Sequence, residues 1–432
     1  MLWAIHRPDG DASEETSMTA TTAAATDDEI FTPDFFDDPY PSYRAFREQD
    51  PVLQLPFNLR LEQAQEQFHD DSRSWFVTGF DACGEVLRDH RRYSSVVAGV
   101  PAEEQERARL VLINTDPPRH TRLRTMLNKA FTPRRINELE PWVRSLVGSL
   151  LDAAGTGEVD LASTVAEPLP IMVIASLIGV AEGDLATFKT WSDAMVAVPE
   201  PETIEANRAK TQAMFDYIGA LVTDRRTAIE SGSDALSDDF LAALIRGAAE
   251  DDGLEDWEIT SFCVLLLLAG NETTRNLVTC LLNVAADRPQ LWQALRADRG
   301  LVTPSIEESL RYDSPVQILN RWATEDVELG GHLIRAGENV AVAYAAGNRD
   351  PQQFDRPEEF VADRKENRHL AFGVGIHFCL GAPLARLETQ VLVAQLLDRY
   401  PVIGRSGPPT FQHAARVVRG LTSLPLTLSE QG

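Results

Sequence analysis

The sequence predicts a mainly α-helical protein with minor β-sheets. Apolar residues recur at helical spacing through most of residues 121–249, and a second long helical stretch covers residues 254–287. Only short runs near the N-terminus and beyond Glu325 have the composition of strands. With 432 residues, of which 44% are hydrophobic and 25% charged, the chain can bury a large core.

The charge balance excludes two classes of partner. Lys and Arg total 40 and Asp and Glu total 66, so the net charge is −26. Nucleic acid and an anionic membrane surface both need a basic face, so neither is an expected partner. No two of the four cysteines have C-x-x-C spacing, which argues against a zinc ribbon or a redox pair. Four cysteines in 432 residues do not indicate a disulfide scaffold, so we expect a reducing, cytoplasmic compartment.

The elements are expected in the following order. Residues 1–30 are rich in Ala, Thr, Ser and acids and predict a disordered leader, followed by one domain over residues 31–432. Residues 52–55 and 75–78 predict two strands that pair at a sheet edge, joined by the long linker 56–74. Helices then follow, with breaks expected at Pro133, Pro168, Pro170, Gly179 and residues 231–233.

The stretch 254–287 predicts a helix that is buried on all sides. Its run of eight apolar residues, 262–269, is far shorter than the roughly 18–20 that cross a bilayer. Beyond it, Gly330-Gly331 predicts a hairpin turn between strands 327–329 and 332–334. A strand at 339–344, a helix at 382–400 and short strands near Val417 and Leu426 complete the chain.

A glycine-rich loop around a cysteine is the strongest chemical signal. Glycines let backbone N–H groups turn toward the sulfur, and the helix start that follows adds positive charge, so both favour the metal-ligating thiolate. The other three cysteines are expected to pack as small hydrophobic residues. The loop is Phe372-Gly373-Val374-Gly375-Ile376-His377-Phe378-Cys379-Leu380-Gly381.

This loop resembles the haem-binding signature of the cytochrome P450 superfamily, with every fixed position filled, and the resemblance to soluble bacterial members extends from about Asp38 to Leu428. It implies a triangular helical prism around a buried haem b (iron protoporphyrin IX). Cys379 would be the axial thiolate and metal ligand, with Phe372 and Gly373 beside it. Thiolate ligation favours O–O cleavage.

Further residues match the family by position. Glu308 and Arg311 match its Glu-x-x-Arg motif and would form a structural ion pair, with Arg364 as a third partner. The two haem propionates would be held by four basic side chains. These are His120, Arg124, Arg321 and His377.

The central helix contains Ala269-Gly270-Asn271-Glu272-Thr273-Thr274. The residues alone suggest that Thr273 bonds back to its own helix. The resemblance implies instead an acid–alcohol pair, in which Thr273 and Glu272 deliver protons for catalysis. Gly270 would leave room for dioxygen over the haem, and Ala269 would adjoin the cofactor.

The resemblance also implies a mostly apolar substrate pocket. Its expected walls are Val97 in the loop 96–100, Leu265, Leu268, Gln317, Asn320, Leu421 and Thr422. For the polar pair Gln317 and Asn320, two roles stay open: hydrogen bonding to a substrate, or satisfying backbone groups.

The implied activity is that of a monomeric haem-thiolate monooxygenase, which inserts one atom of O₂ into a small lipophilic substrate. Its electrons would come from a ferredoxin and an NAD(P)H-dependent ferredoxin reductase. Residues 119–135 contain six basic residues and no acid, and predict either a ferredoxin-docking patch or an ordinary solvated face. The alternatives are a haem sensor without turnover and a peroxide-driven or isomerase-type enzyme, and the Glu272–Thr273 pair argues against both.

Overall fold

The structure is a computed structural model that describes residues 32–55, 74–96, 112–196, 203–232, 240–249, 254–413 and 417–430. Three expectations lie outside these residues: the leader 1–30, almost all of the linker 56–74, and Val97 with most of its loop.

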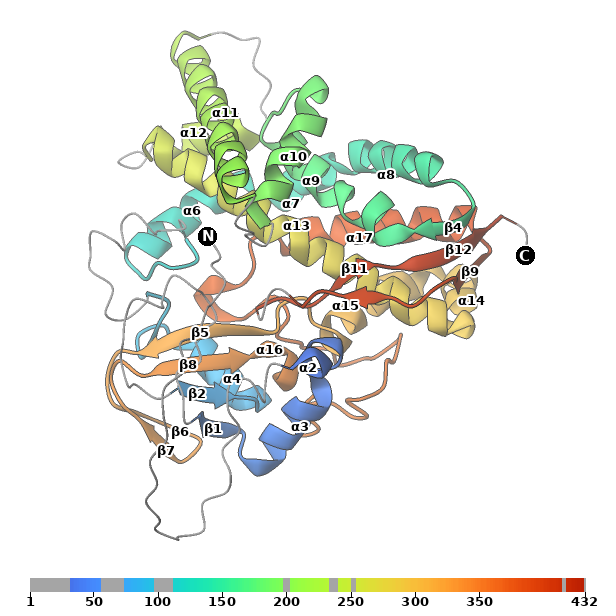
Figure 1. Cartoon of the computed structure of the whole chain (residues 1–432). Coiled ribbons are helices and arrows are strands. Elements are labelled where there is room, and N and C mark those ends of the chain that lie inside the picture. Colours follow the sequence, from blue (N-terminus) through green and yellow to red (C-terminus); the bar gives the residue numbers. More distant parts are fainter. Residues whose placement is uncertain are drawn as a thin grey trace.

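Helices dominate the described chain (Figure 1). Before the central helix these are α2 (Pro33–Asp37), α3 (Tyr40–Gln49), α4 (Phe80–Arg88), α6 (Arg119–Ala130), α7 (Pro133–Glu138), α8 (Glu140–Ala154), α9 (Pro168–Leu177), α10 (Leu185–Val196), α11 (Ile204–Glu230) and α12 (Phe240–Ala249). The central helix is α13 (Asp256–Asp287), followed by α14 (Pro289–Ala297), α15 (Val302–Tyr312), α16 (Tyr344–Gly347) and α17 (Ala382–Arg399).

The helix boundaries follow the expected breaks, with one correction. Pro133 and Pro168 begin α7 and α9, where the first backbone N–H groups have no partner in the helix. Gly179, at φ +87°, follows α9, and α11 ends at Glu230. Pro170 does not break a helix: it lies in the first turn of α9, where a missing N–H costs no hydrogen bond.

The main sheet has five strands in the order β1-β2-β8-β5-β3. Its strands are β1 (Val52–Leu55), β2 (Ser74–Val77), β3 (Tyr93–Ser94), β5 (Ile318–Ala323) and β8 (Asn339–Ala343). β1 and β2 pair antiparallel at the edge, as predicted. Alternate residues of β8 face opposite ways: Val340 and Val342 pack with α4 residues, whereas Ala341 and Ala343 pack with α3 residues.

Smaller strands pair beyond the main sheet. The hairpin β6 (Val327–Leu329) and β7 (His332–Ile334) turns at two glycines with positive φ, which confirms that prediction. β12 (Pro425–Ser429) pairs with β4 (Gly157–Asp160) and β9 (Val402–Arg405). β10 (Thr410–Phe411) pairs with β11 (Leu421–Ser423).

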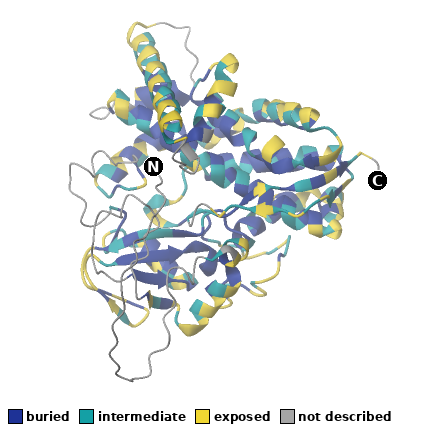
Figure 2. Cartoon of the chain, viewed as in Figure 1, coloured by how far each residue is buried: buried dark blue, intermediate teal, exposed yellow. Residues whose placement is uncertain are grey.

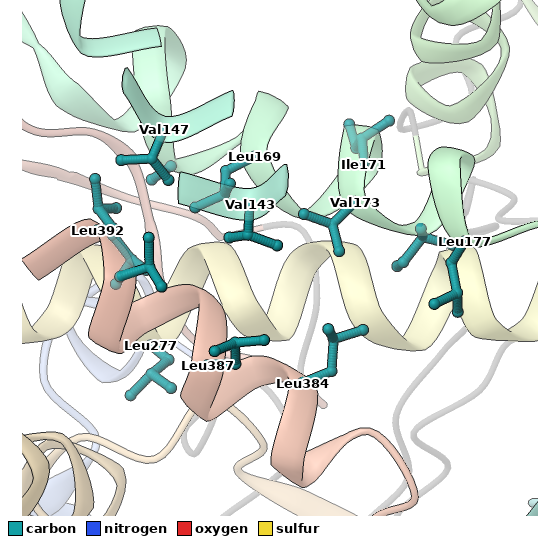
Figure 3. Close-up of a cluster of buried hydrophobic side chains, with 14 of the residues drawn as sticks. Val143, Val147, Leu169, Ile171, Val173, Leu177, Leu277, Leu384, Leu387 and Leu392 are labelled. Atoms are coloured by element: carbon teal, nitrogen blue, oxygen red, sulfur yellow. The ribbon is translucent and has the colours of Figure 1, made fainter. Parts of the chain in front are cut away.

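The helix α13 passes through the largest core, as expected from its all-apolar run. It begins with a capping box between Glu255 and Glu258. Side chains of α8, α9 and α17 surround it, and Figure 3 shows Val143, Leu169, Leu277 and Leu387 within this cluster. Figure 2 shows the same region as buried. Within the described residues, no helix has the length and apolar composition that a membrane span requires.

Candidate functional site

A cavity of about 380 Å³ lies beside the middle of α13. Its walls come from α13, β5, the loop before α17 and the segments 112–114 and 417–418. Ten of the residues singled out by the cysteine-loop, propionate and central-helix motifs line it together: Arg124, Ala269, Gly270, Glu272, Thr273, Arg321, Phe372, Gly373, His377 and Cys379. Four distant parts of the sequence therefore meet around one space.

The cysteine loop owes its shape to its glycines. Gly373 and Gly375 have φ of +67° and +78°, a conformation that other residues rarely adopt. A Cβ on Gly375 would lie 2.5 Å from the carbonyl oxygen of Leu87, so this glycine also lets the loop abut the end of α4. The N–H of Cys379 donates to the carbonyl oxygen of Phe372 at 2.9 Å, which holds the cysteine at the cavity wall.

The four basic side chains gather at one side of the cavity. The rings of His120 and His377 lie 4.3 Å apart, and Nε2 of His377 is 2.9 Å from Oγ of Ser95. Nε2 of His120 is buried without a hydrogen-bond partner in the described chain. Arg321 donates to the carbonyl oxygen of Asn320 at 2.7 Å.

Burial, followed by the charges of nearby basic groups, lowers the pKa of His120 to about 4 and that of His377 to about 3. Both rings are therefore neutral at pH 7 in this structure. As neutral rings, the two histidines offer N–H groups beside the guanidinium groups of Arg124 and Arg321.

The helix α13 places Glu272 and Thr273 on the cavity wall. The Thr273 hydroxyl donates to the carbonyl oxygen of Ala269 at 2.7 Å, which is the back-bonding that the residues alone suggested. The Glu272 carboxylate lies 3.6 Å from the Arg275 guanidinium. The helix is continuous through this turn, so the pair is present with both members engaged within their own helix.

Gly270 also has a packing role beside the one expected for it. A Cβ at this position would lie 2.7 Å from Cδ1 of Ile174 in α9. The missing side chain therefore makes room for a neighbouring helix, and close packing of α9 on α13 accounts for the glycine. Its backbone still lines the cavity.

The Glu-x-x-Arg pair is fully buried. Two nitrogens of Arg311 donate to the two carboxylate oxygens of Glu308, each at 2.8 Å, and both side chains have 0% exposure. Nε of Arg364 lies 3.0 Å from the same carboxylate, which also accepts the N–H of Val361. Arg311 donates further to the carbonyl oxygens of Asn348, Pro357 and Glu359. The pair thus ties α15 to residues 348–364.

Comparison with known proteins agrees with this geometry. A family model described as "Cytochrome P450" matches residues 188–426. The cytochrome P450 monooxygenase PikC of Streptomyces venezuelae is 38% identical, covering 91% of this chain and 92% of PikC. The 6-deoxyerythronolide B hydroxylase of Saccharopolyspora erythraea is 36% identical over 91% of this chain and 97% of its own. The chain belongs to the cytochrome P450 family.

Solved structures extend the comparison to the fold. The polyketide synthase cytochrome P450 PksS of Bacillus subtilis superposes with a TM-score of 0.82 at 32% identity, over 93% of this chain and 99% of PksS. CYP109E1 of Bacillus megaterium in complex with corticosterone superposes with a TM-score of 0.78 at 34% identity, over 90% of this chain and 98% of CYP109E1. The expected P450 fold is confirmed. The protein is a P450 monooxygenase whose haem iron has the Cys379 thiolate as its axial ligand.

The residues present fit a haem. Within the described chain, no carboxylate lies at ion-pair distance from Arg124 or Arg321, and Nε2 of His120 is an unpartnered buried atom on the same side. Two propionates need such donors. Burial raises the pKa of the Cys379 thiol, opposed by the N–H groups of Gly381 and Ala382 and by the charge of Arg124. A haem iron bound here would add its positive charge to these groups in favour of the Cys379 thiolate.

The P450 substrate pocket differs from the expectation at three positions. Leu265, Leu268 and Asn320 line the cavity, whereas Gln317, Leu421 and Thr422 do not. The Tyr43 hydroxyl donates to Oε1 of Gln317 at 3.1 Å, and Nε2 of Gln317 donates to the carbonyl oxygen of Ser314 at 2.6 Å. Gln317 therefore satisfies buried groups of the fold. Leu421 is buried within β11, and Thr422 bonds to Thr410.

Several residues of the cavity wall were not predicted from the sequence. Val417 and Val418 replace Leu421 and Thr422 on the wall, because the carbonyl oxygen of Val417 accepts the N–H of Gln317 and Val418 bridges to Val316. Ser95, which meets His377, was missed as well. Of the two expected polar anchors only Asn320 faces the cavity, and its Oδ1 is buried without a partner among described residues.

The basic stretch 119–135 is partly neutralised by acids from elsewhere. Arg119 pairs with Glu258 of α13 at 2.8 Å, and Arg134 pairs with Glu138 at 2.8 Å. Arg124 turns to the cavity. Arg122 and Lys129 are exposed on α6.

Proposed function

We propose that this P450 inserts one oxygen atom from O₂ into a small lipophilic organic substrate, with electrons supplied by a ferredoxin and an NAD(P)H-dependent ferredoxin reductase. One observation carries the proposal: the same cavity contains Cys379, the Glu272–Thr273 pair and an apolar wall. None of the four cysteines forms a disulfide, which suits the reducing cytoplasm in which we place the protein.

The apolar wall determines the class of substrate. Leu112, Leu265, Leu268, Val417 and Val418 line the cavity, and apolar surface of this kind favours a lipophilic ligand over a charged one. Asn320 supplies one amide, which we propose orients an oxygen or nitrogen of the substrate. Binding a substrate against these side chains also excludes water from the reacting position.

When bound, the haem supplies the redox chemistry of oxygen activation. We propose that the chain contributes two proton-handling groups. The Thr273 hydroxyl exchanges its bond to the Ala269 carbonyl for one into the cavity, where it donates. The Glu272 carboxylate, only loosely held by Arg275, exchanges protons between solvent and the Thr273 hydroxyl, which is general acid catalysis with water as the source.

Turnover stoichiometry tests the function. Lipophilic compounds, including corticosterone, are screened by spin-state shift, and the best one is incubated with the holoprotein, NADH, a surrogate ferredoxin and its reductase. We expect oxygenated product in near-equal amount to NADH consumed. Thr273→Ala should lower product per NADH at least ten-fold and release peroxide, because the proton donor is lost.

Thr260→Ala is the matched control, because Thr260 makes the same back-bond in α13 but lies away from the cavity. Equal product yields in the two variants would refute the role of Thr273. Absence of any oxygenated product from the parent protein would refute the monooxygenase proposal and favour a sensor.

The ferredoxin proposal rests on α6. Arg122 and Lys129 are exposed on the helix that brings Arg124 within electrostatic reach of Cys379, so an acidic partner docked there would lie near the haem ligand. In a chain of net charge −26, such a basic surface would orient the encounter.

Charge reversal tests this surface. Arg122→Glu combined with Lys129→Glu should slow reduction by the surrogate ferredoxin about ten-fold at low salt and weaken its salt dependence, as measured by stopped-flow. Arg144→Glu combined with Arg208→Glu, at exposed arginines of α8 and α11, is the control for net charge. If the double variant is reduced by the ferredoxin as fast as the control variant, this surface is not the docking site.

A further inference from the structure

An ion pair beside the cysteine loop is not used by the mechanism above. Glu307 of α15 and Arg386 of α17 meet in a two-pronged contact: Nε of Arg386 donates to Oε1 at 2.7 Å and Nη2 donates to Oε2 at 2.8 Å. Nε2 of His369 lies 3.1 Å from Oε2 of Glu307. Because Nδ1 of His369 accepts the N–H of Ala371, Nε2 carries the hydrogen and donates to Glu307.

The pair is connected to the haem ligand through Phe372. The Arg386 guanidinium lies over the Phe372 ring, 4.5 Å from its centroid, which is a cation–π contact. The carbonyl oxygen of Phe372 accepts the N–H of Cys379. A fixed positive charge is therefore packed against the loop that carries the thiolate.

The carboxylate of this pair is charged at neutral pH. Burial raises the pKa of Glu307, but hydrogen bonds from Arg386 and His369 outweigh it and lower that pKa to about 2. The side chains are only 30% and 24% exposed. Salt therefore screens their field less than that of a surface pair.

We propose that the Glu307–Arg386 pair sets the reduction potential of the Cys379-ligated haem: Arg386 raises it, and Glu307 limits that increase. The proposal rests on the haem-thiolate assignment and adds a function for residues outside the cavity. Reduction transfers one electron from an external donor to the ferric iron and makes the site more negative. A nearby cation favours this product, and a nearby anion disfavours it.

The test is an equilibrium redox titration of the purified holoprotein with dithionite and mediator dyes, without ferredoxin. Arg386→Met should lower the equilibrium constant for reduction three- to ten-fold. At 59 mV per decade for one electron, this lowers the midpoint reduction potential by roughly 30–60 mV. Glu307→Gln should raise it by a similar factor. Arg386→Lys retains the charge and should stay near the parent value.

The opposite signs separate electrostatics from mere structural damage, which would move both variants in one direction. Arg399→Met, which removes another ion-paired arginine of α17, whose partner is Asp152, is the control. Shifts of the same sign, or shifts no larger than that control, would overturn the proposal. A retained thiolate-type spectrum of the reduced carbon monoxide complex shows that the ligand is intact. Because no turnover is needed, a missing oxygenated product would count against the proposed function and not against this inference.

Discussion

Cys379→Ser should abolish the thiolate signature of the reduced carbon monoxide complex and reduce oxygenated product to below detection. A serine hydroxyl at the same place cannot supply the electron density that a thiolate gives to iron. The propionate-side residues Arg124, Arg321 and His120 are unchanged, so haem should still bind, more weakly. Absorption spectroscopy of the reduced, carbon monoxide-treated protein measures the first effect, and the haem-to-protein ratio measures the second.

Cys263→Ala is the control for this experiment. Cys263 is buried in α13, and burial raises the pKa of its thiol to about 12, so it behaves as a small apolar side chain. Its replacement should leave the thiolate spectrum unchanged. A thiolate spectrum that survived in Cys379→Ser would mean that another residue ligates the iron.

The features that the sequence predicted well are those encoded locally. The glycines around Cys379 and the spacing of Glu308 and Arg311 lie within a few residues, where backbone geometry limits the outcomes. The hairpin at Gly330-Gly331 is local in the same way. Each could be interpreted without knowing what packs against it.

The features predicted wrongly depend on contacts between distant segments. Whether residue 418 or 421 reaches the cavity depends on the bridge between Val316 and Val418, which no local pattern encodes. Arg119 finds its acid partner Glu258 in another helix.

Glu308→Gln should cost about 3–5 kcal/mol of folding free energy, because it leaves two buried arginines, Arg311 and Arg364, without their counter-charge. That is a large share of the 5–15 kcal/mol by which a typical protein is stable. Arg311→Met should be at least as damaging, since the carbonyl oxygens of Asn348 and Pro357 lose their donor as well. Denaturant unfolding of each holoprotein measures the loss.

Glu205→Gln on α11 is the matched control. Glu205 and Arg208 have the same i,i+3 spacing as Glu308 and Arg311, but their side chains are 81% and 55% exposed and 3.4 Å apart. Such a pair contributes at most about 1 kcal/mol. If Glu308→Gln unfolded no more easily than Glu205→Gln, burial would not be the source of the pair's strength.

The double variant Glu308→Gln with Arg311→Met separates the ion pair from the backbone contacts. If the cost of each single change came only from a stranded charge, removing both charges would restore most of the stability. The structure predicts otherwise: Arg364 still lacks its carboxylate, and the carbonyl oxygens of Asn348 and Pro357 still lack a donor. The double variant should therefore remain about as unstable as Arg311→Met. It should also lose haem more readily, because the segment that Arg311 holds leads directly into the loop of Cys379.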